Sequence, residues 1–482
     1  MTGLGTLAVW PGPALVAWVV AAVAAGAPVA PLLVLAVALA PLLALLQPAR
    51  ATAPRHPVTL ALVAIVAALV LSAHLAALAD GAALIGARRW HAIVLAAALT
   101  LLVTLMPGAR RWPGVAPLIG GAALLGVLLA AAVSTGLAPW AAWADAAARP
   151  ALVFSGQSPW VIEGERFVRR TTLAFDDGQR VVAVAPGTFR VVEHDGGRRV
   201  VRDWRLGAGD ALTLRPGDTL TVEAGSRLRF EPGKRVPGAP ASGPAWGDAA
   251  PDASPVRSLA LLATLALGAC ALVPAPARRV IAAVFIALGL SLGASSWGAY
   301  ATLAAPEAGL AGSPIEALLS LPRAMPATAR GVTGGALIAV VMCGLLALFV
   351  AAAEGLRHAL RDAAGTRWPA VWTAVMGGAS LVSIISVMDP LTPLMTGLGL
   401  AGAALAAPRL AAGRDAGRRL GWPVEVIGAV LGAAVFAAVA VANPPAALES
   451  LAAFPVLVAA PVAFCGVRLL RAARGDARSR AR

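Results

Sequence analysis

Residues 188–204, TFRVVEHDGGRRVVRDW, are two runs in which apolar and polar side chains nearly alternate, joined by Asp195-Gly196-Gly197. Alternation with a period of two predicts strands with one dry face and one wet face. Asp-Gly and Gly-Gly pairs favour tight hairpins because Gly adopts positive φ without strain. Similar short runs and turns fill residues 153–256. They predict about seven strands in a small antiparallel sandwich or barrel, followed by a Pro-, Gly- and Ala-rich tether.

Outside this interval the chain has the composition of a membrane protein. Of its 482 residues 59% are hydrophobic and 13% are charged, and the mean hydropathy is +0.80. A helix needs about 20 mostly apolar residues to cross a hydrocarbon core of roughly 30 Å. This rule predicts spans near residues 8–26, 28–47, 58–79, 91–107, 114–138, 258–274, 280–303, 332–354, 368–388, 391–408, 422–442 and 451–470.

The predicted fold is a polytopic α-helical membrane protein of about 12 transmembrane helices, with one small all-β extracytoplasmic domain inserted between helices 5 and 6. This fold divides the chain into four parts. They are an N-terminal membrane block (1–152), the β domain with its tether (153–256), a C-terminal membrane block (257–472) and an Arg-rich cytoplasmic tail (473–482).

The arginine residues orient the predicted spans. Clusters of Arg follow the second, fourth, sixth, eighth and tenth spans, and another cluster ends the chain. Cations are retained on the cytoplasmic side, so we expect both termini in the cytoplasm and residues 153–256 outside. Abundant Ala, Gly and Pro, and Arg in place of Lys at every basic position except Lys234, indicate a GC-rich bacterial genome and hence a bacterial inner membrane. Four external arginines depart from the pattern: Arg88, Arg89, Arg323 and Arg330.

Composition and motifs also exclude several classes of function. The net charge of +15 does not indicate nucleic-acid binding, because topology and anionic lipid headgroups explain cytoplasmic Arg clusters. The sequence lacks a phosphate-binding Gly-Lys loop, a His-Glu-x-x-His zinc motif and a Gly-x-Ser-x-Gly elbow. All three Cys fall in predicted spans, so neither a disulfide framework nor a Cys metal site is expected. The bilayer and other envelope or membrane subunits are the expected partners.

The most polar membrane stretch lies between residues 376 and 402. If it holds a site, we expect Ser383, Ser386, Asp389 and Thr392 to form it, as a hairpin whose broken helix ends face a substrate. Tight packing of small residues without any ligand predicts the same pattern and is the commoner case.

Three further ionisable residues are candidates for chemistry because ionisable groups are costly inside a membrane. His74 and His91, on neighbouring spans, could bind a b-type haem or transfer protons. A single interhelical hydrogen bond is the commoner role of such a His, and no other cofactor is predicted. Glu354 could be a coupling carboxylate, although pairing with the nearby Arg357 at a helix end is commoner.

Residues 314–321 form a short amphipathic segment between two predicted spans. Helices with one apolar and one polar face bind at membrane surfaces. We therefore expect this segment to lie along the outer interface.

Two classes of function remain. The first is a transporter, or a membrane scaffold of an envelope complex, whose β domain binds an external partner or substrate. The alternative is a membrane enzyme that acts on lipid-linked or envelope substrates at the outer face, with Asp389 or Asp80 beside external Arg groups. A b-type haem protein that uses His74 and His91 is a third hypothesis.

Overall fold

A computed structural model gives the fold for most of the chain. It describes residues 12–24, parts of 32–46, 56–105, 112–148, 161–162, 171–175, 178–183, 186–195, 198–207, 209–223, 226, 228–230, 255–272, 277–304, 314–325, 334–385, 391–412, 422–441 and 454–480.

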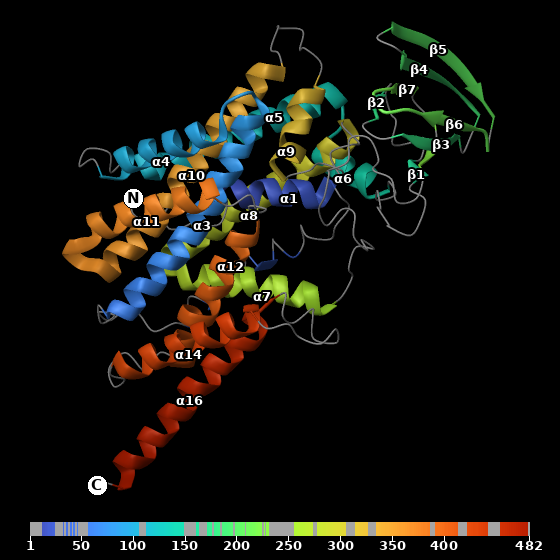
Figure 1. Cartoon of the computed structure of the whole chain (residues 1–482). Coiled ribbons are helices and arrows are strands. Elements are labelled where there is room, and N and C mark those ends of the chain that lie inside the picture. The colour runs from blue at the N-terminus through green and yellow to red at the C-terminus, as the bar shows by residue number, and fades with distance from the viewer. Residues whose placement is uncertain are drawn as a thin grey trace.

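The described chain consists of apolar helices and one group of strands (Figure 1). The helices are α1 (Pro13–Ala24), α3 (Pro57–Leu84), α4 (Arg89–Leu105), α5 (Trp112–Thr135), α6 (Pro139–Ala148), α7 (Pro255–Leu272), α8 (Ala277–Ala304), α9 (Pro314–Ala324), α10 (Gly334–Ala364), η6 (Gly365–Arg367), α11 (Trp368–Ile385), α12 (Leu391–Ala401), η7 (Gly402–Ala406), α13 (Ala407–Ala412), α14 (Trp422–Val441) and α16 (Val456–Arg480).

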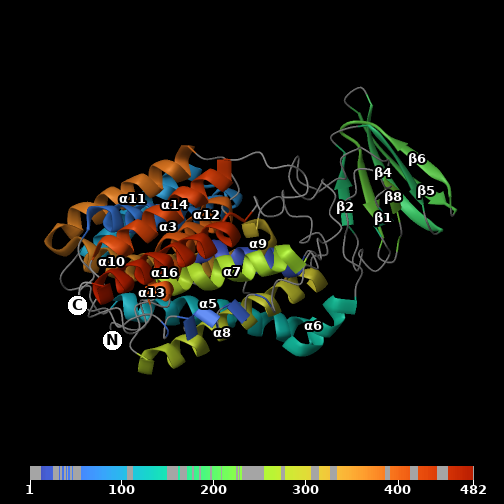
Figure 2. The same ribbon diagram turned by 90° about the horizontal axis from the view of Figure 1, so that it is seen from below.

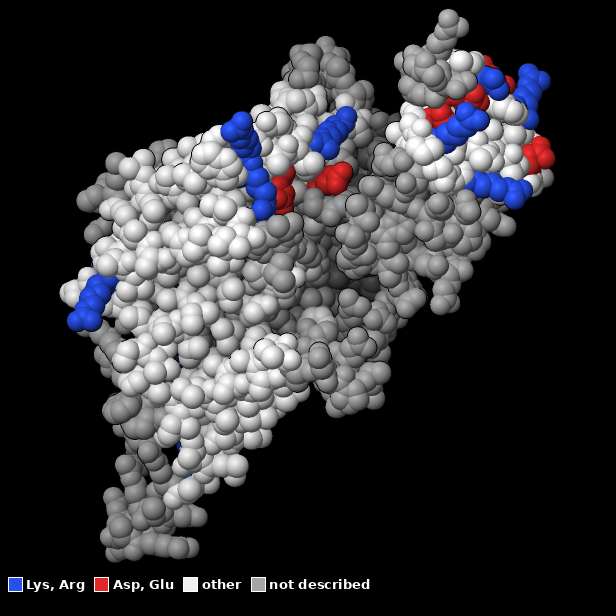
Figure 3. Space-filling view, viewed as in Figure 1, with Lys and Arg blue, Asp and Glu red and all other residues white. Residues whose placement is uncertain are grey.

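Among the described residues, six helical segments are long and apolar enough to cross a membrane: Pro57–Leu84, Leu118–Thr135, Gly334–His358, Gly365–Ile385, Leu391–Ala411 and Val456–Ala473. Shorter apolar helices cover Pro13–Ala24, Arg89–Leu105, Leu259–Leu272 and Val426–Val441. On the face shown in Figure 3, most of the described surface of the helical part is uncharged, and a few charged side chains lie in its upper part and at its left edge. The structure confirms a mostly helical chain with six candidate membrane-spanning helices and a small antiparallel β region. The number of twelve spans and the place of the β domain between spans 5 and 6 stay predictions.

Helix α3 is the centre of the bundle. It packs against α1, α4, α9, α10, α11 and α12, and its buried side chains extend from Leu62 to Ala82. Small residues allow the closest approaches between helices. A Cβ on Gly120 of α5 would lie 2.9 Å from the carbonyl oxygen of Gly344 on α10, so only Gly permits this crossing without a shift of backbone.

Helix α9 differs from its prediction as a surface helix. Ile315, Leu318, Leu319 and Leu321 are all buried, and the helix packs against α1, α3, α8 and α10. The indole N–H of Trp297 on α8 donates to the carbonyl oxygen of Leu318 at 2.9 Å. The apolar face of α9 is therefore covered by protein, because neighbouring helices supply the apolar surface that lipid was expected to supply.

The strands lie between α6 and α7 in the sequence and form two antiparallel sheets of four strands each. One sheet has the order β1-β8-β3-β6 and the other the order β2-β7-β4-β5. The bounds are β1 (Val161–Ile162), β2 (Thr171–Ala174), β3 (Gln179–Ala183), β4 (Gly187–Asp195), β5 (Arg198–Leu206), β6 (Ala211–Leu214), β7 (Thr219–Val222) and β8 (Leu228–Phe230). The hairpin predicted from residues 188–204 is confirmed as β4 and β5.

A separate apolar core joins the two sheets into a sandwich. Phe175, Phe189 and Val191 are buried in it together with Leu214, Leu220 and other residues of alternate strand positions. Figures 1 and 2 show the sandwich beyond the side of the helical part at which α6 lies, whereas α16 ends at the opposite side.

Candidate functional sites

Ser383 lies inside the bundle, where α11 packs against α3. Its hydroxyl is 2.9 Å from the carbonyl oxygen of Ser72 on α3 and 2.8 Å from that of Ala379 on its own helix. The side chain is buried, so its one hydroxyl hydrogen is donated within the protein. This is a packing contact between two helices.

The other residues of the predicted polar hairpin are not brought to Ser383 within the described chain. Ser386 and Asp389 lie outside the described residues, and Thr392 is exposed in the first turn of α12. The hydroxyl of Thr396 donates to the carbonyl oxygen of Thr392 at 2.8 Å, a contact within one helix. A substrate site of these four residues therefore remains a prediction.

His74 is buried on α3, and its ring closes the N-terminal end of α1. The backbone N–H of Ala14 donates to Nδ1 at 3.3 Å. The first N–H groups of a helix have no carbonyl partner within that helix. The imidazole thus takes the place of a capping side chain, although it comes from a residue 60 positions later.

The second nitrogen of His74 faces a different environment. Because Nδ1 accepts a hydrogen bond, the neutral ring carries its proton on Nε2. Nε2 is buried and has no hydrogen-bond partner among the described residues. Gly12 lies against this edge of the ring, where an added Cβ would overlap the imidazole. The ring is therefore enclosed between α3 and the start of α1.

His91 has different surroundings from His74. It is exposed in the first turn of α4, and its ring centroid lies 3.6 Å from that of Trp90. The contacts of the two His share no residue in the described part of the chain, so the geometry offers no support for a shared haem. Within that same part, no group of three or more His, Cys, Asp and Glu side chains could hold a metal ion.

Glu354 is the centre of an ion cluster on α10. Both of its carboxylate oxygens accept hydrogen bonds from the Arg357 guanidinium, with 2.6 Å between Oε2 and Nε, and Oε1 is 3.1 Å from Nε2 of His358. Glu354 is 4% exposed and Arg357 8%. The guanidinium also lies 5.0 Å from the ring centroid of Trp368 on α11, a cation–π contact. The carboxylate is thus held by its own helix, and Arg357 joins α10 to α11 through Trp368.

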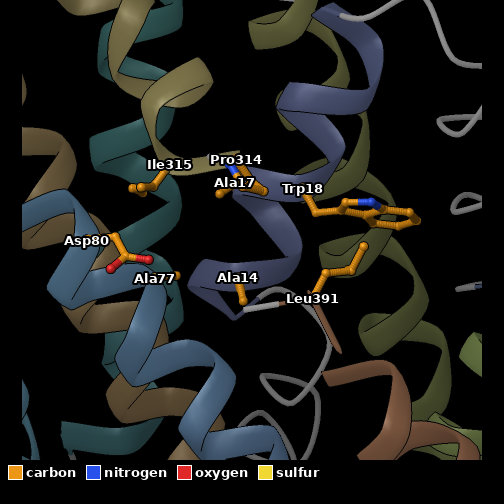
Figure 4. A pocket seen from close by; sticks show the side chains of 8 residues that line it. All are labelled: Ala14, Ala17, Trp18, Ala77, Asp80, Pro314, Ile315 and Leu391. Atoms are coloured by element: carbon orange, nitrogen blue, oxygen red, sulfur yellow. The ribbon is translucent and has the colours of Figure 1, made fainter. Parts of the chain in front are cut away.

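A small cavity lies between α1, α3, α9 and α12 (Figure 4). Asp80 is its charged lining residue, and the Asp80 carboxylate pairs with Nε of Arg89 at 2.8 Å. The cavity volume is about 10 Å³, close to the least space that one water molecule requires. This cavity is too small for a lipid-linked substrate. Its lining residues are Ala14, Ala17, Trp18, Ala77, Asp80, Pro314, Ile315 and Leu391.

Strand β5 forms one edge of the sandwich and carries exposed apolar side chains. Val200 is 36% exposed, Val201 56% and Trp204 37%. Charged side chains of both signs lie on the same domain (Figure 3). Arg190 of β4 and Asp203 of β5 form a pair with distances of 2.7 and 3.1 Å. The hydrogen bond from Arg190 to Asp203 raises the pKa of the Arg190 guanidinium, which therefore stays charged.

Sequence reasoning missed three of these features. Gly12 and Ala14 were not identified as partners of His74, and the edge position of β5 was not foreseen. The Gly12-Pro13 pair is a signal that could have placed a helix start, since Pro is favoured in the first helical turn. No comparable signal gives the order of strands in a sheet.

Comparisons with known proteins place the chain in no group. No family model matches it, and neither a curated protein nor a solved structure matches it. The function must therefore be argued from the sites themselves.

Proposed function

We propose that the protein is a non-enzymatic membrane component, a scaffold subunit of an envelope complex that recruits an external partner through its β sandwich. One observation carries this proposal: apart from Nε2 of His74, the polar contacts described in the helical interior are made within the protein itself, while the sandwich exposes apolar side chains on an edge strand.

The interior contacts favour a scaffold over a transporter. The indole N–H of Trp372 on α11 donates to the hydroxyl oxygen of Thr104 on α4 at 3.0 Å. The hydroxyl of Tyr300 on α8 donates to the carbonyl oxygen of Leu137, between α5 and α6, at 2.6 Å. A transport path requires polar groups that exchange partners with a cargo. These groups instead join neighbouring parts of the bundle, which suits a rigid anchor.

We further propose about twelve crossings, with the shorter apolar helices among them and with both termini cytoplasmic. Two Arg contacts support this orientation. Arg409 donates to the carbonyl oxygen of Ala271 at the end of α7, at 3.1 Å, and Arg471 donates to that of Ala411 in α13, at 3.0 Å. Cations are favourable at helix C-termini and are enriched on the cytoplasmic side. The sandwich is then extracytoplasmic.

The test is purification of the tagged full-length protein from its own host in mild detergent, with mass spectrometry of co-eluting proteins after chemical cross-linking. We expect a stoichiometric partner whose cross-links end within residues 171–230. Substrate-dependent turnover by the isolated protein would contradict the scaffold and favour the enzyme hypothesis. A Soret band in the same fraction would favour the haem hypothesis.

A further inference from the structure

Among the described residues, the four edge strands of the sandwich differ greatly in length. β5 has nine residues, whereas β1 has two and β2 and β6 have four each. An edge strand presents unpaired N–H and C=O groups to any chain that can pair with it. The length of β5 makes it the edge that offers most backbone for such pairing.

The hairpin of β4 and β5 also extends beyond its own sheet. β4 pairs with β5 along all of Gly187–Asp195, but with β7 only from Phe189 to Val192. Its last three residues, 193–195, are therefore paired with β5 alone and form a short arm of two strands. Two-stranded ribbons are marginally stable alone and gain from a third strand.

The register shows that β5 continues the apolar surfaces of β4. Residues directly opposite each other share a face of the sheet, and Trp204 lies opposite Phe189 while Val201 lies opposite Val192. Phe189 and Val192 are buried, whereas their β5 counterparts are exposed. One additional strand beside β5 would cover these side chains in the same way that β5 covers those of β4.

The charges on β5 indicate which charge the additional strand should carry. β5 contains four Arg and one Asp, and the Asp, Asp203, is bound to Arg190. Arg202 lies 3.7 Å from Glu193, a distance that leaves it open to a closer carboxylate. Antiparallel pairing of β5 with a second copy of itself, centred on Arg202, would set Arg202 opposite Arg202, and like charges across strands are destabilising. An acidic chain suits this edge.

We propose that β5 binds an extended segment of a partner protein as an added edge strand, with Asp or Glu opposite Arg202 and Arg205. In the partner segment, acidic residues then occur three positions apart, with β-branched or aromatic residues between them. This inference rests on the proposed scaffold function and specifies its partner. Backbone hydrogen bonds supply the affinity in this mode of recognition, and the side chains supply the specificity.

The experiment measures peptide binding to the full-length protein in nanodiscs of neutral lipid by fluorescence anisotropy. The probe is a ten-residue peptide with Glu at every third position and Val or Thr between. A second peptide has Lys in place of each Glu, and a third has Pro at its centre. We expect the Glu peptide to bind at least about tenfold more tightly than the other two, and Arg202→Glu to weaken its binding about tenfold or more.

The matched control is Arg215→Glu, which makes the same change of charge at an exposed turn between β6 and β7. It should leave binding unchanged. Equal binding of the Glu and Lys peptides, equal loss in both variants, or no binding would overturn the proposal. A change of oligomeric state in Arg202→Glu would also overturn it, since the occupant would then be a second copy. Cross-links to a native partner elsewhere on the sandwich would preserve the scaffold function while this inference fails.

Discussion

His74 on α3 and Gly12 at the start of α1 are in direct contact, and a methyl group on Gly12 would overlap the imidazole ring. The contact fixes where α1 begins, because the same ring accepts the N–H of Ala14. It joins the start of a short apolar helix to the central helix of the bundle.

Gly12→Ala is expected to destabilise the detergent-solubilised protein by about 2 kcal/mol, because the added methyl group overpacks a closed contact. The loss is measured by thermal unfolding followed through Trp fluorescence. Gly126→Ala on α5 is the control, since its Cβ would meet no atom within 4 Å. Ala is favoured over Gly in helices, so the control should be neutral or stabilising. Equal losses in both variants would contradict the contact.

Ser383→Ala is expected to cost about 0.6 kcal/mol of stability, the average value for a polar contact between membrane helices. It should leave partner co-purification intact, because the hydroxyl only joins α11 to α3. Ser380→Ala is the matched control, since its hydroxyl donates only to its own helix at Met376. Loss of function in Ser383→Ala at unchanged stability would instead indicate a ligand site.

Glu354→Gln is expected to destabilise the protein by on the order of 3 kcal/mol, because it leaves the buried Arg357 without its carboxylate. Chemical denaturation in detergent gives the difference. Asp203→Asn is the comparison, since it breaks the exposed pair with Arg190, and exposed pairs contribute little. A small effect of Glu354→Gln would show that the cluster is open to water.

Trp204→Ala and Phe189→Ala should separate binding from folding in the sandwich. Phe189 is fully buried, so its truncation should cost about 3–5 kcal/mol and unfold the domain. Trp204 lies opposite it on the exposed edge, so its truncation should leave the fold intact and weaken partner binding. Circular dichroism and the peptide assay measure the two effects. Unchanged binding in Trp204→Ala would remove this residue from the docking surface.

The sequence predicted those parts of the fold that depend on local pattern. Alternation and a Gly-Gly turn indicated β4 and β5, and long apolar runs indicated helices such as α3 and α10. These signals are local because strand and helix periodicity arise within a few residues.

Features that depend on distant contacts could not be predicted in this way. The amphipathic pattern of α9 correctly indicates a helix with one apolar face, but it does not distinguish lipid from protein as the neighbour of that face. Likewise β5 is an edge strand because the sheet order is β2-β7-β4-β5, which chain order does not reveal. For His74 the sequence indicated a costly buried group, while its partner is 60 residues away.

The bond between Ala14 and His74 also has a consequence for biosynthesis. At roughly 5–20 residues per second, the 60 residues that separate the two partners take about 3–12 s to translate. During that interval the first turn of α1 lacks its acceptor, and an unsatisfied N–H is costly in lipid. We therefore expect the nascent α1 to stay near the insertion machinery until α3 emerges, so that the two helices enter the bilayer as a pair.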